Sequence, residues 1–443
     1  MKRYIYIYIY IYIAFALLTF TSCDYKEKEL FSKKPSERSV NVLQTYKDLL
    51  ETPNTYWVLT SYPGVNNTAF WAYPYNPTVF ATERDYPRYP RSIGGYSTVL
   101  KFGDGMVTAS SEVNANNDES SSYFSYTTTE GPTLSFETYN SSLHHFSYVT
   151  NRFPTGRGGE TEFLILKEEN GVLMLIGRKS NNLATLRKLE GDRETFLNKL
   201  RENSNALKNK ALMPITVNGT EVTLKFFSSY RQLDFLWDNN QKYDQRAFAI
   251  TEKGFKLYEP ITINGVTFSE FYINDTKTGL TTADGTISTN FVNAPFVPTH
   301  SEHKISLIDL WASPKLVNFF NSRKRAIIRK FNSGYTLSST LTFNTLAEGN
   351  DGAGVSILYT DVGIYECYYE LEFVGVAGAP NQVEILFRDA WEYKYNAIFS
   401  FSDVKNLYLQ LAKFSPYTVE DQLNGYYLFT SARDNTVWFY VAQ

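Results

Sequence analysis

Residues 96–111 read YSTVLKFGDGMVTASS, and their pattern recurs along most of the chain. Two runs rich in β-branched and aromatic residues flank Asp104-Gly105, a dipeptide that favours a two-residue hairpin turn. Similar runs surround Asn170-Gly171, Asn218-Gly219 and Asn264-Gly265. Strands joined by such short turns form antiparallel sheets that curve strongly or close into barrels. We therefore predict a mostly β protein with two antiparallel meander modules, each a curved sheet or a barrel.

The composition agrees with this prediction. The chain has 34 Tyr, 32 Phe and 6 Trp, but only 4 Met and 4 His. Aromatic side chains favour half-buried, pleated surfaces, so most of them are expected to fill strand positions. Some aromatic residues of this kind also line binding sites for sugars and peptides.

Three helices are expected between the strands. Apolar residues recur at helical spacing over 37–51, and Thr52-Pro53 ends that pattern. Asp192 suits the N-cap of a second helix over 192–203, and Ser313-Pro314 suits the start of a third. The segment GGYSTVLKF at 94–102 is echoed by SGYTL at 333–337, so we expect each meander module to pack against a helix.

The N-terminal segment resembles the signal of a bacterial lipoprotein. Lys2 and Arg3 precede an apolar run, and residues 18–23 read LTFTSC. In such signals the cysteine, here Cys23, receives a diacylglyceryl group and becomes the new N-terminus. The alternative is a transmembrane anchor, although the run from Tyr4 to Phe20 is near the lower length limit for a bilayer crossing. The expected organisation is a signal peptide over 1–22, a tether over 23–30, and β-rich modules over 31–205 and 206–443.

Length, charge and cysteine content limit the classes of function that the chain could have. Removal of residues 1–22 leaves 421 of the 443 residues, which is enough to bury large cores. The formal charge then falls from −3 to about −5, because Lys2 and Arg3 are lost. A chain without a basic excess is not expected to bind nucleic acid. Once Cys23 carries lipid, Cys367 has no partner for an intramolecular disulfide, and its strand-like surroundings favour a structural thiol.

No catalytic or metal-binding motif stands out. The four histidines are His144, His145, His300 and His303, and the last two lie in loop-like sequence that we interpret as solvated. His144 is expected to form hydrogen bonds beside the turn at Tyr139-Asn140. The chain lacks the nucleophile-elbow, phosphate-loop and dinucleotide motifs. We expect no cofactor.

Two acidic pairs are open to a catalytic or a structural interpretation. Glu160 and Glu162 would share one strand face, where paired carboxylates could serve glycoside hydrolysis or bind calcium. The same charges would also keep a strand edge soluble, and the segment Asp389-Ala390-Trp391-Glu392 has the same two interpretations.

A segment rich in Tyr, Pro and Arg, over 73–91, is the candidate ligand-binding surface. Prolines at this density cannot lie inside a sheet, so the segment is expected to be an exposed loop. Tyr rings offer stacking faces and Arg offers hydrogen-bond donors. The candidate binding residues are Tyr73, Tyr75, Tyr86, Arg88 and Tyr89. The alternative is a loop whose tyrosines pack back onto the sheet.

Several short motifs, in order, resemble the DUF4302 family, whose members are Bacteroidetes lipoproteins without an assigned function. The motifs are GGY at 94–96, LKF at 100–102, GPTLSF at 131–136, YN at 139–140 with LH at 143–144, GGETEF at 158–163 and GRK at 177–179. The resemblance covers roughly 31–275. Two positions depart from the family pattern: NTYW at 54–57 stands where Asn-Gly-Trp is expected, and Glu160 where Asp is expected.

The resemblance implies a place at the cell surface. Members resemble accessory lipoproteins encoded near SusC/SusD-type outer-membrane uptake systems, which implies nutrient capture and SusC/SusD-like partners. The sequence thus predicts a lipid-anchored outer-membrane protein that faces outward and binds a glycan or peptide without catalysis. A structural or adhesive surface protein and a hydrolase are the alternatives.

Overall fold

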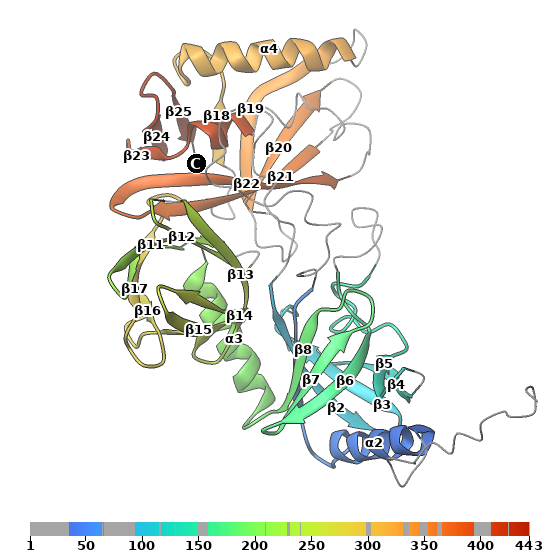
Figure 1. Cartoon of the computed structure of the whole chain (residues 1–443). Helices are drawn as coiled ribbons and strands as arrows, with labels where there is room; N and C mark the ends of the chain where they lie inside the picture. The colour runs from blue at the N-terminus through green and yellow to red at the C-terminus, as the bar shows by residue number, and fades with distance from the viewer. Residues whose placement is uncertain are drawn as a thin grey trace, which may run out of the picture.

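The structure is a computed structural model of the whole chain. It describes residues 35–63, 65, 94–114, 117–128, 130–148, 158–208, 210–227, 231–239, 241–297, 303–330, 336–345, 353–360, 366–393, 409–423 and 425–442. The described strands form three antiparallel sheets that follow one another along the chain (Figure 1).

The first sheet is a closed barrel in which each strand pairs with its neighbours in sequence and β1 pairs back onto β8. Its core contains Trp57, Leu100, Phe163 and Leu173, all almost fully buried. The strands are β1 (Trp57–Ser61), β2 (Tyr96–Gly103), β3 (Met106–Ser111), β4 (Ser120–Thr127), β5 (Thr133–Phe136), β6 (Glu162–Glu169), β7 (Val172–Gly177) and β8 (Leu183–Lys188).

The second sheet has nine strands and ends at two short edges, β9 and β10. A row of phenylalanines, including Phe226, Phe248, Phe255 and Phe271, fills its core. The strands are β9 (Lys210–Leu212), β10 (Ile215–Val217), β11 (Thr220–Phe227), β12 (Gln232–Trp237), β13 (Lys242–Ile250), β14 (Gly254–Ile263), β15 (Val266–Ile273), β16 (Gly279–Thr281) and β17 (Ser288–Asn293).

The third sheet is a second closed barrel, in which β18 pairs with both β19 and β25. Phe296, from the segment before β18, packs inside it against Phe373 and Phe429. The strands are β18 (His303–Ser306), β19 (Thr336–Thr345), β20 (Ala353–Thr360), β21 (Glu366–Val376), β22 (Ala379–Tyr393), β23 (Tyr417–Asp421), β24 (Tyr426–Ser431) and β25 (Trp438–Ala442).

The three expected helices are present: α2 (Pro35–Leu50), α3 (Arg193–Leu207) and α4 (Pro314–Lys330). Figure 1 shows α2 beside the first barrel, α4 along the outside of the last barrel, and α3 next to the nine-stranded sheet. Leu50 of α2 is buried in the core of the first barrel, and Phe320 of α4 in that of the last. Asp192 caps α3 by accepting a hydrogen bond from the Thr195 N–H at 2.8 Å. Within the described part of the chain, no helix is long and apolar enough to cross a membrane.

The prediction of a mostly β protein with antiparallel, barrel-like meanders and packed helices is confirmed. The turn dipeptides form hairpins as predicted; Asn170 and Gly171, for example, have φ of 53° and 77°, the left-handed values of a type I′ turn. The C-terminal segment 206–443 holds two sheets, the nine-stranded one and the second barrel. Residues 96–102 of the first echoed segment lie in β2, and residues 336–337 of the second lie in β19, each the second strand of a barrel along the chain.

Gly94 and Gly95 allow the first barrel and the nine-stranded sheet to touch through their backbones. The Gly95 N–H donates to the carbonyl of Phe248 at 2.8 Å. A Cβ on Gly95 would lie 2.5 Å from that of Ala249, and one on Gly94 would lie 2.4 Å from that of Arg231. Only glycine therefore fits at this contact, which explains the GGY motif physically.

A buried ion pair lies at the same contact. Glu112 follows β3 and Arg231 precedes β12, and their side chains are only 2% and 6% exposed. The guanidinium donates to the carboxylate at 2.7 and 3.1 Å, and it also donates to the Gly95 carbonyl at 2.5 Å. It stacks over the Tyr96 ring at 3.7 Å. The first barrel and the nine-stranded sheet are thus joined by a desolvated polar contact.

Candidate ligand-binding site

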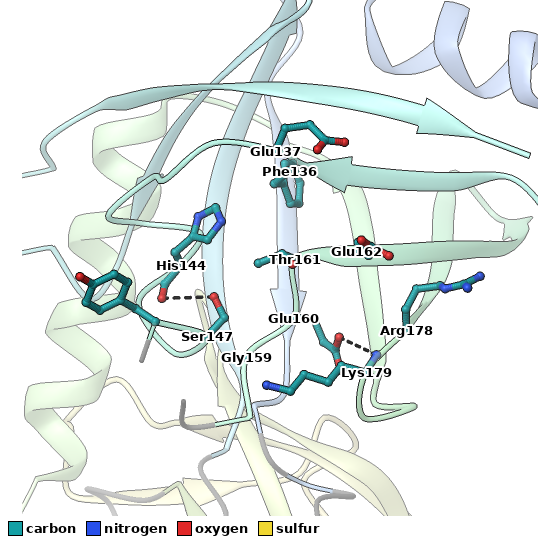
Figure 2. A pocket seen from close by; sticks show the side chains of 11 residues that line it. Phe136, Glu137, His144, Ser147, Gly159, Glu160, Thr161, Glu162, Arg178 and Lys179 are labelled. Atoms are coloured by element: carbon teal, nitrogen blue, oxygen red, sulfur yellow. Dashed lines mark hydrogen bonds between the residues drawn. The ribbon is translucent and has the colours of Figure 1, made fainter. Parts of the chain in front are cut away.

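The first barrel carries a pocket at the end where β5 finishes, β6 begins and β7 finishes. Its volume is about 780 Å³. Because neighbouring strands are antiparallel, these three termini meet at one edge of the barrel. The lining residues are Phe136, Glu137, His144, Ser147, Tyr148, Gly159, Glu160, Thr161, Glu162, Arg178 and Lys179. Figure 2 shows Thr161 in the middle, with His144 and Ser147 on one side and Glu162 and Arg178 on the other.

Asn140 shapes the wall that carries His144. Its buried side-chain carbonyl accepts from the N–H groups of Ser142 and Leu143 at 3.0 and 3.2 Å, and from the Ser120 hydroxyl at 2.6 Å. The backbone N–H of Asn140 donates to His144 Nδ1 at 3.1 Å. The predicted hydrogen-bonding role of His144 beside this turn is therefore confirmed.

His144 is held in one tautomer. Burial lowers the pKa of its imidazole from the usual value, so the ring is neutral at pH 7. Because Nδ1 accepts the hydrogen bond from Asn140, the proton of the neutral ring lies on Nε2. His144 therefore offers a neutral N–H donor at the pocket wall.

Two tyrosines beside this wall expose their rings to solvent. Tyr148, which lines the pocket, is 57% exposed, and Tyr139 is 61% exposed. Their ring centroids are 5.3 Å apart in an edge-to-face arrangement, and Tyr139 also lies 5.8 Å from the His144 ring. Aromatic rings held in this way are stacking surfaces for the apolar faces of a ligand.

Glu160 forms the floor of the pocket and binds the turn after β7. Its carboxylate accepts from the N–H groups of Lys179 and Ser180 at 3.0 and 2.6 Å, and from the Ser180 hydroxyl. A Cβ on Gly177 would lie 2.3 Å from the Glu160 Cγ, so glycine is needed where this side chain crosses the strand. The GGETEF and GRK motifs therefore meet through Glu160 (Figure 2).

The acidic pair is arranged differently from the expectation. β6 begins at Glu162, so Glu160 precedes the strand and the two residues do not share one strand face. Glu162 is exposed, and Glu137 joins both in the pocket lining. Glu137 accepts from the Ser125 hydroxyl, and Arg178 forms an ion pair with Glu130. The pocket thus combines three carboxylates with two cationic side chains.

The remaining residues that the sequence singles out lie in different environments or outside the described residues. Cys23, Tyr73, Tyr75, Tyr86, Arg88 and Tyr89 lie outside the described residues, as does His300. His303 does not lie in a solvated loop: it begins β18, is 3% exposed and packs against Phe296, which lies in the core of the second barrel. Cys367 lies in β21, as expected. Among the described residues, no group of three or more His, Cys, Asp or Glu is placed to hold a metal ion.

The sequence placed Tyr139 in a turn but did not indicate that Tyr139 and Tyr148 lie at a pocket. These residues come from a loop between β5 and β6, and nothing in their local sequence marks them as exposed. The signal available was the set of family motifs, because GPTLSF, LH, GGETEF and GRK each contribute residues to the same lining.

The structure is that of a β-rich protein whose first barrel carries a polar pocket edged by aromatic residues. The chain belongs to the DUF4302 family, a domain of unknown function, whose model matches residues 27–275. This range takes in the first barrel and the nine-stranded sheet as far as β15, and it confirms the family resemblance seen in the motifs.

No curated protein matches this chain. One solved structure, titled "The Structure of Intact Ap-TbpB (N and C lobes)", is 10% identical and covers 88% of this chain and 75% of that chain, with a TM-score of 0.11. A TM-score this low carries no argument about fold or function.

Proposed function

We propose that this protein is a lipid-anchored binding protein that captures a glycan or peptide in the pocket of the first barrel, without catalysis. The observation that carries the proposal is the pocket itself. The exposed Tyr148 lines the same pocket as the Ser147 hydroxyl, which can donate and accept hydrogen bonds, and the Glu162 carboxylate, which accepts them. Sugars and peptides present apolar faces edged by polar groups, so a site that binds them combines aromatic rings with hydrogen-bonding groups.

The N-terminal segment supports a place at the outer membrane. Cys23 would carry the lipid and residues 23–30 would form the tether. The protein would face outward and serve as an accessory to nutrient uptake by SusC/SusD-like partners. The Tyr/Pro/Arg segment over 73–91 stays a separate candidate for ligand binding.

A pull-down of the native protein from mildly solubilised outer membrane tests the accessory role. Mass spectrometry is expected to recover a SusC/SusD-like pair in near-stoichiometric amount. Recovery of the protein alone, or only with itself, contradicts the accessory role. The substrate of the recovered uptake system then becomes the first ligand to test for binding.

A hydrolase is the second candidate, because Glu137, Glu160 and Glu162 line one pocket beside aromatic residues. Glycoside hydrolysis requires two carboxyl groups facing one bond. Glu160 already accepts hydrogen bonds from Lys179 and Ser180, which suits a structural role better than proton transfer. Cleavage of a glycan by the wild type that is abolished in Glu137→Gln or Glu162→Gln would establish the hydrolase. An intact glycan after prolonged incubation is the result that the binding role requires.

The adhesive alternative receives little support from the described strands. Strand exchange between molecules needs a long free sheet edge. Both barrels are closed, and the nine-stranded sheet ends at β9 (Lys210–Leu212) and β10 (Ile215–Val217), each three residues long.

A further inference from the structure

The second barrel exposes several large apolar side chains on two turns that are far from the pocket in sequence. Leu310 is 87% exposed and Leu423 is 73% exposed, and Ile308 and Trp311 are 46% and 37% exposed. Trp311 contacts the half-buried rings of Tyr426 and Tyr440, with centroids 5.3 and 5.9 Å away. We call this surface the apolar tip; it consists of Ile308, Leu310, Trp311, Leu423, Tyr426 and Tyr440.

Both leucines are held in a backbone conformation that their side chains disfavour. Leu310 has φ of 73° and Leu423 has φ of 63°, in the left-handed region that a branched apolar residue rarely adopts. Such strain persists only where the surroundings impose it, and it concentrates at functional positions. Leu310 and Leu423 thus occupy two exposed turn positions at which Gly or Asn would be less strained.

Hydrogen bonds fix the apolar tip to the barrel. The Tyr440 N–H donates to the Trp311 carbonyl at 2.9 Å, and the Trp311 N–H donates to the Ile308 carbonyl at 3.2 Å. On the other turn, the Leu423 N–H donates to Asp421 Oδ1 at 2.8 Å. The two leucines therefore lie on preformed turns, so that less conformational entropy of these turns is lost when a partner binds.

Acidic residues predominate around the apolar tip, although the exposed Lys304 of β18 lies across Ala442 from Tyr426. Within 308–312 and 420–427, the charged residues are Asp309, Glu420 and Asp421, and all three are exposed. Two copies meeting through this surface would bring like charges together, which is costly. An anionic lipid surface would also be repelled. The complementary partner is a protein with an apolar pocket bordered by Lys or Arg.

We propose that the apolar tip is the docking surface for a partner protein whose hydrophobic pocket has a basic rim. Leu310 and Leu423 enter the pocket, Trp311 covers its edge, and the acidic residues pair with the rim. The surface lies beyond residues 27–275, the range that the family model matches. The proposal is independent of ligand binding in the first barrel.

The test is site-specific photo-crosslinking in intact cells. A photoreactive phenylalanine analogue replaces Leu310 in one variant and Leu423 in another. A third variant carries it at Tyr123, which is 60% exposed on the first barrel and serves as the matched control. Both tip positions are expected to form an adduct with the same single protein, mapped next to Lys or Arg, and the control is not.

Variants of the apolar tip complete the test on the identified partner. The double variant Leu310→Ser/Leu423→Ser is expected to lower recovery of that protein at least tenfold while the urea midpoint stays unchanged, because both side chains are exposed. Asp309→Lys is expected to weaken binding and reduce its salt dependence. Adducts with a second copy of this chain, with lipid, or with nothing would overturn the proposal, as would a partner that the double variant retains.

Discussion

The buried pair Arg231–Glu112 gives the sharpest test of how the first barrel and the nine-stranded sheet are joined. Replacing Arg231 with Met keeps an unbranched apolar stem but removes the guanidinium. The Glu112 carboxylate then stays buried, with the Ser97 N–H as a remaining donor at 2.7 Å. Removal of one partner from a buried ion pair costs about 3–5 kcal/mol, because the other charge stays desolvated.

Urea unfolding measures this effect. Tryptophan fluorescence follows the transition; Trp57 in the first barrel and Trp237 in the nine-stranded sheet are two of the six tryptophans that contribute. With a slope of about 2 kcal/mol per molar urea, a loss of about 4 kcal/mol lowers the midpoint by about 2 M. We expect one shared transition for the two sheets in the wild type.

A double variant separates the ion pair from simple loss of packing. Arg231→Met combined with Glu112→Leu removes both charges, and such apolar replacements are often neutral or stabilising. The double variant is therefore expected to be more stable than Arg231→Met alone. A midpoint shift of less than about 0.5 M for Arg231→Met would refute this role of the ion pair. A double variant less stable than both the wild type and Arg231→Met would refute it as well.

Three further predictions concern local features. Gly95→Ala would place a Cβ 2.5 Å from that of Ala249 and is expected to cost about 1–3 kcal/mol, whereas Gly103→Ala, with nothing within 4 Å, is expected to be near neutral in the same urea assay. Asp192→Ala removes the cap of α3 and is expected to cost about 1 kcal/mol in thermal unfolding. Burial lowers the folded-state pKa of His144 below its usual 6.5, so below about pH 6.5 the unfolded chain binds more protons. The free energy of unfolding should therefore rise with pH up to about 6.5 through this group and then level off, and a His144→Phe variant should show a smaller rise.

Local features of the fold could be predicted from sequence because they depend on residues close together in the chain. The turns at Asp104-Gly105 and Asn170-Gly171 adopt the left-handed conformations that these residues tolerate. The helices begin where Asp192 and Pro314 stand, because a cap or a first-turn proline needs no distant partner.

Features that depend on distant residues could not be predicted. The need for glycine at Gly95 arises from Ala249, which lies in the neighbouring sheet. The local sequence of His303 is typical of a loop. Its burial comes from a barrel that closes only when β18 pairs with β25, near the C-terminal end of the chain. The pocket likewise forms only when Tyr148, Glu160 and Arg178 are brought to one barrel end.

The most direct test of the proposed function is ligand capture by the pocket. Glycan and peptide arrays are probed with the wild type, with Tyr148→Ala, and with Leu166→Ala as a control that is exposed on β6 and absent from the pocket lining. We expect the wild type and Leu166→Ala to bind one ligand class equally, Tyr148→Ala to bind it at least tenfold more weakly, and the ligand to be recovered intact. Binding that Tyr148→Ala leaves unchanged, or a ligand that is recovered cleaved, would contradict the account.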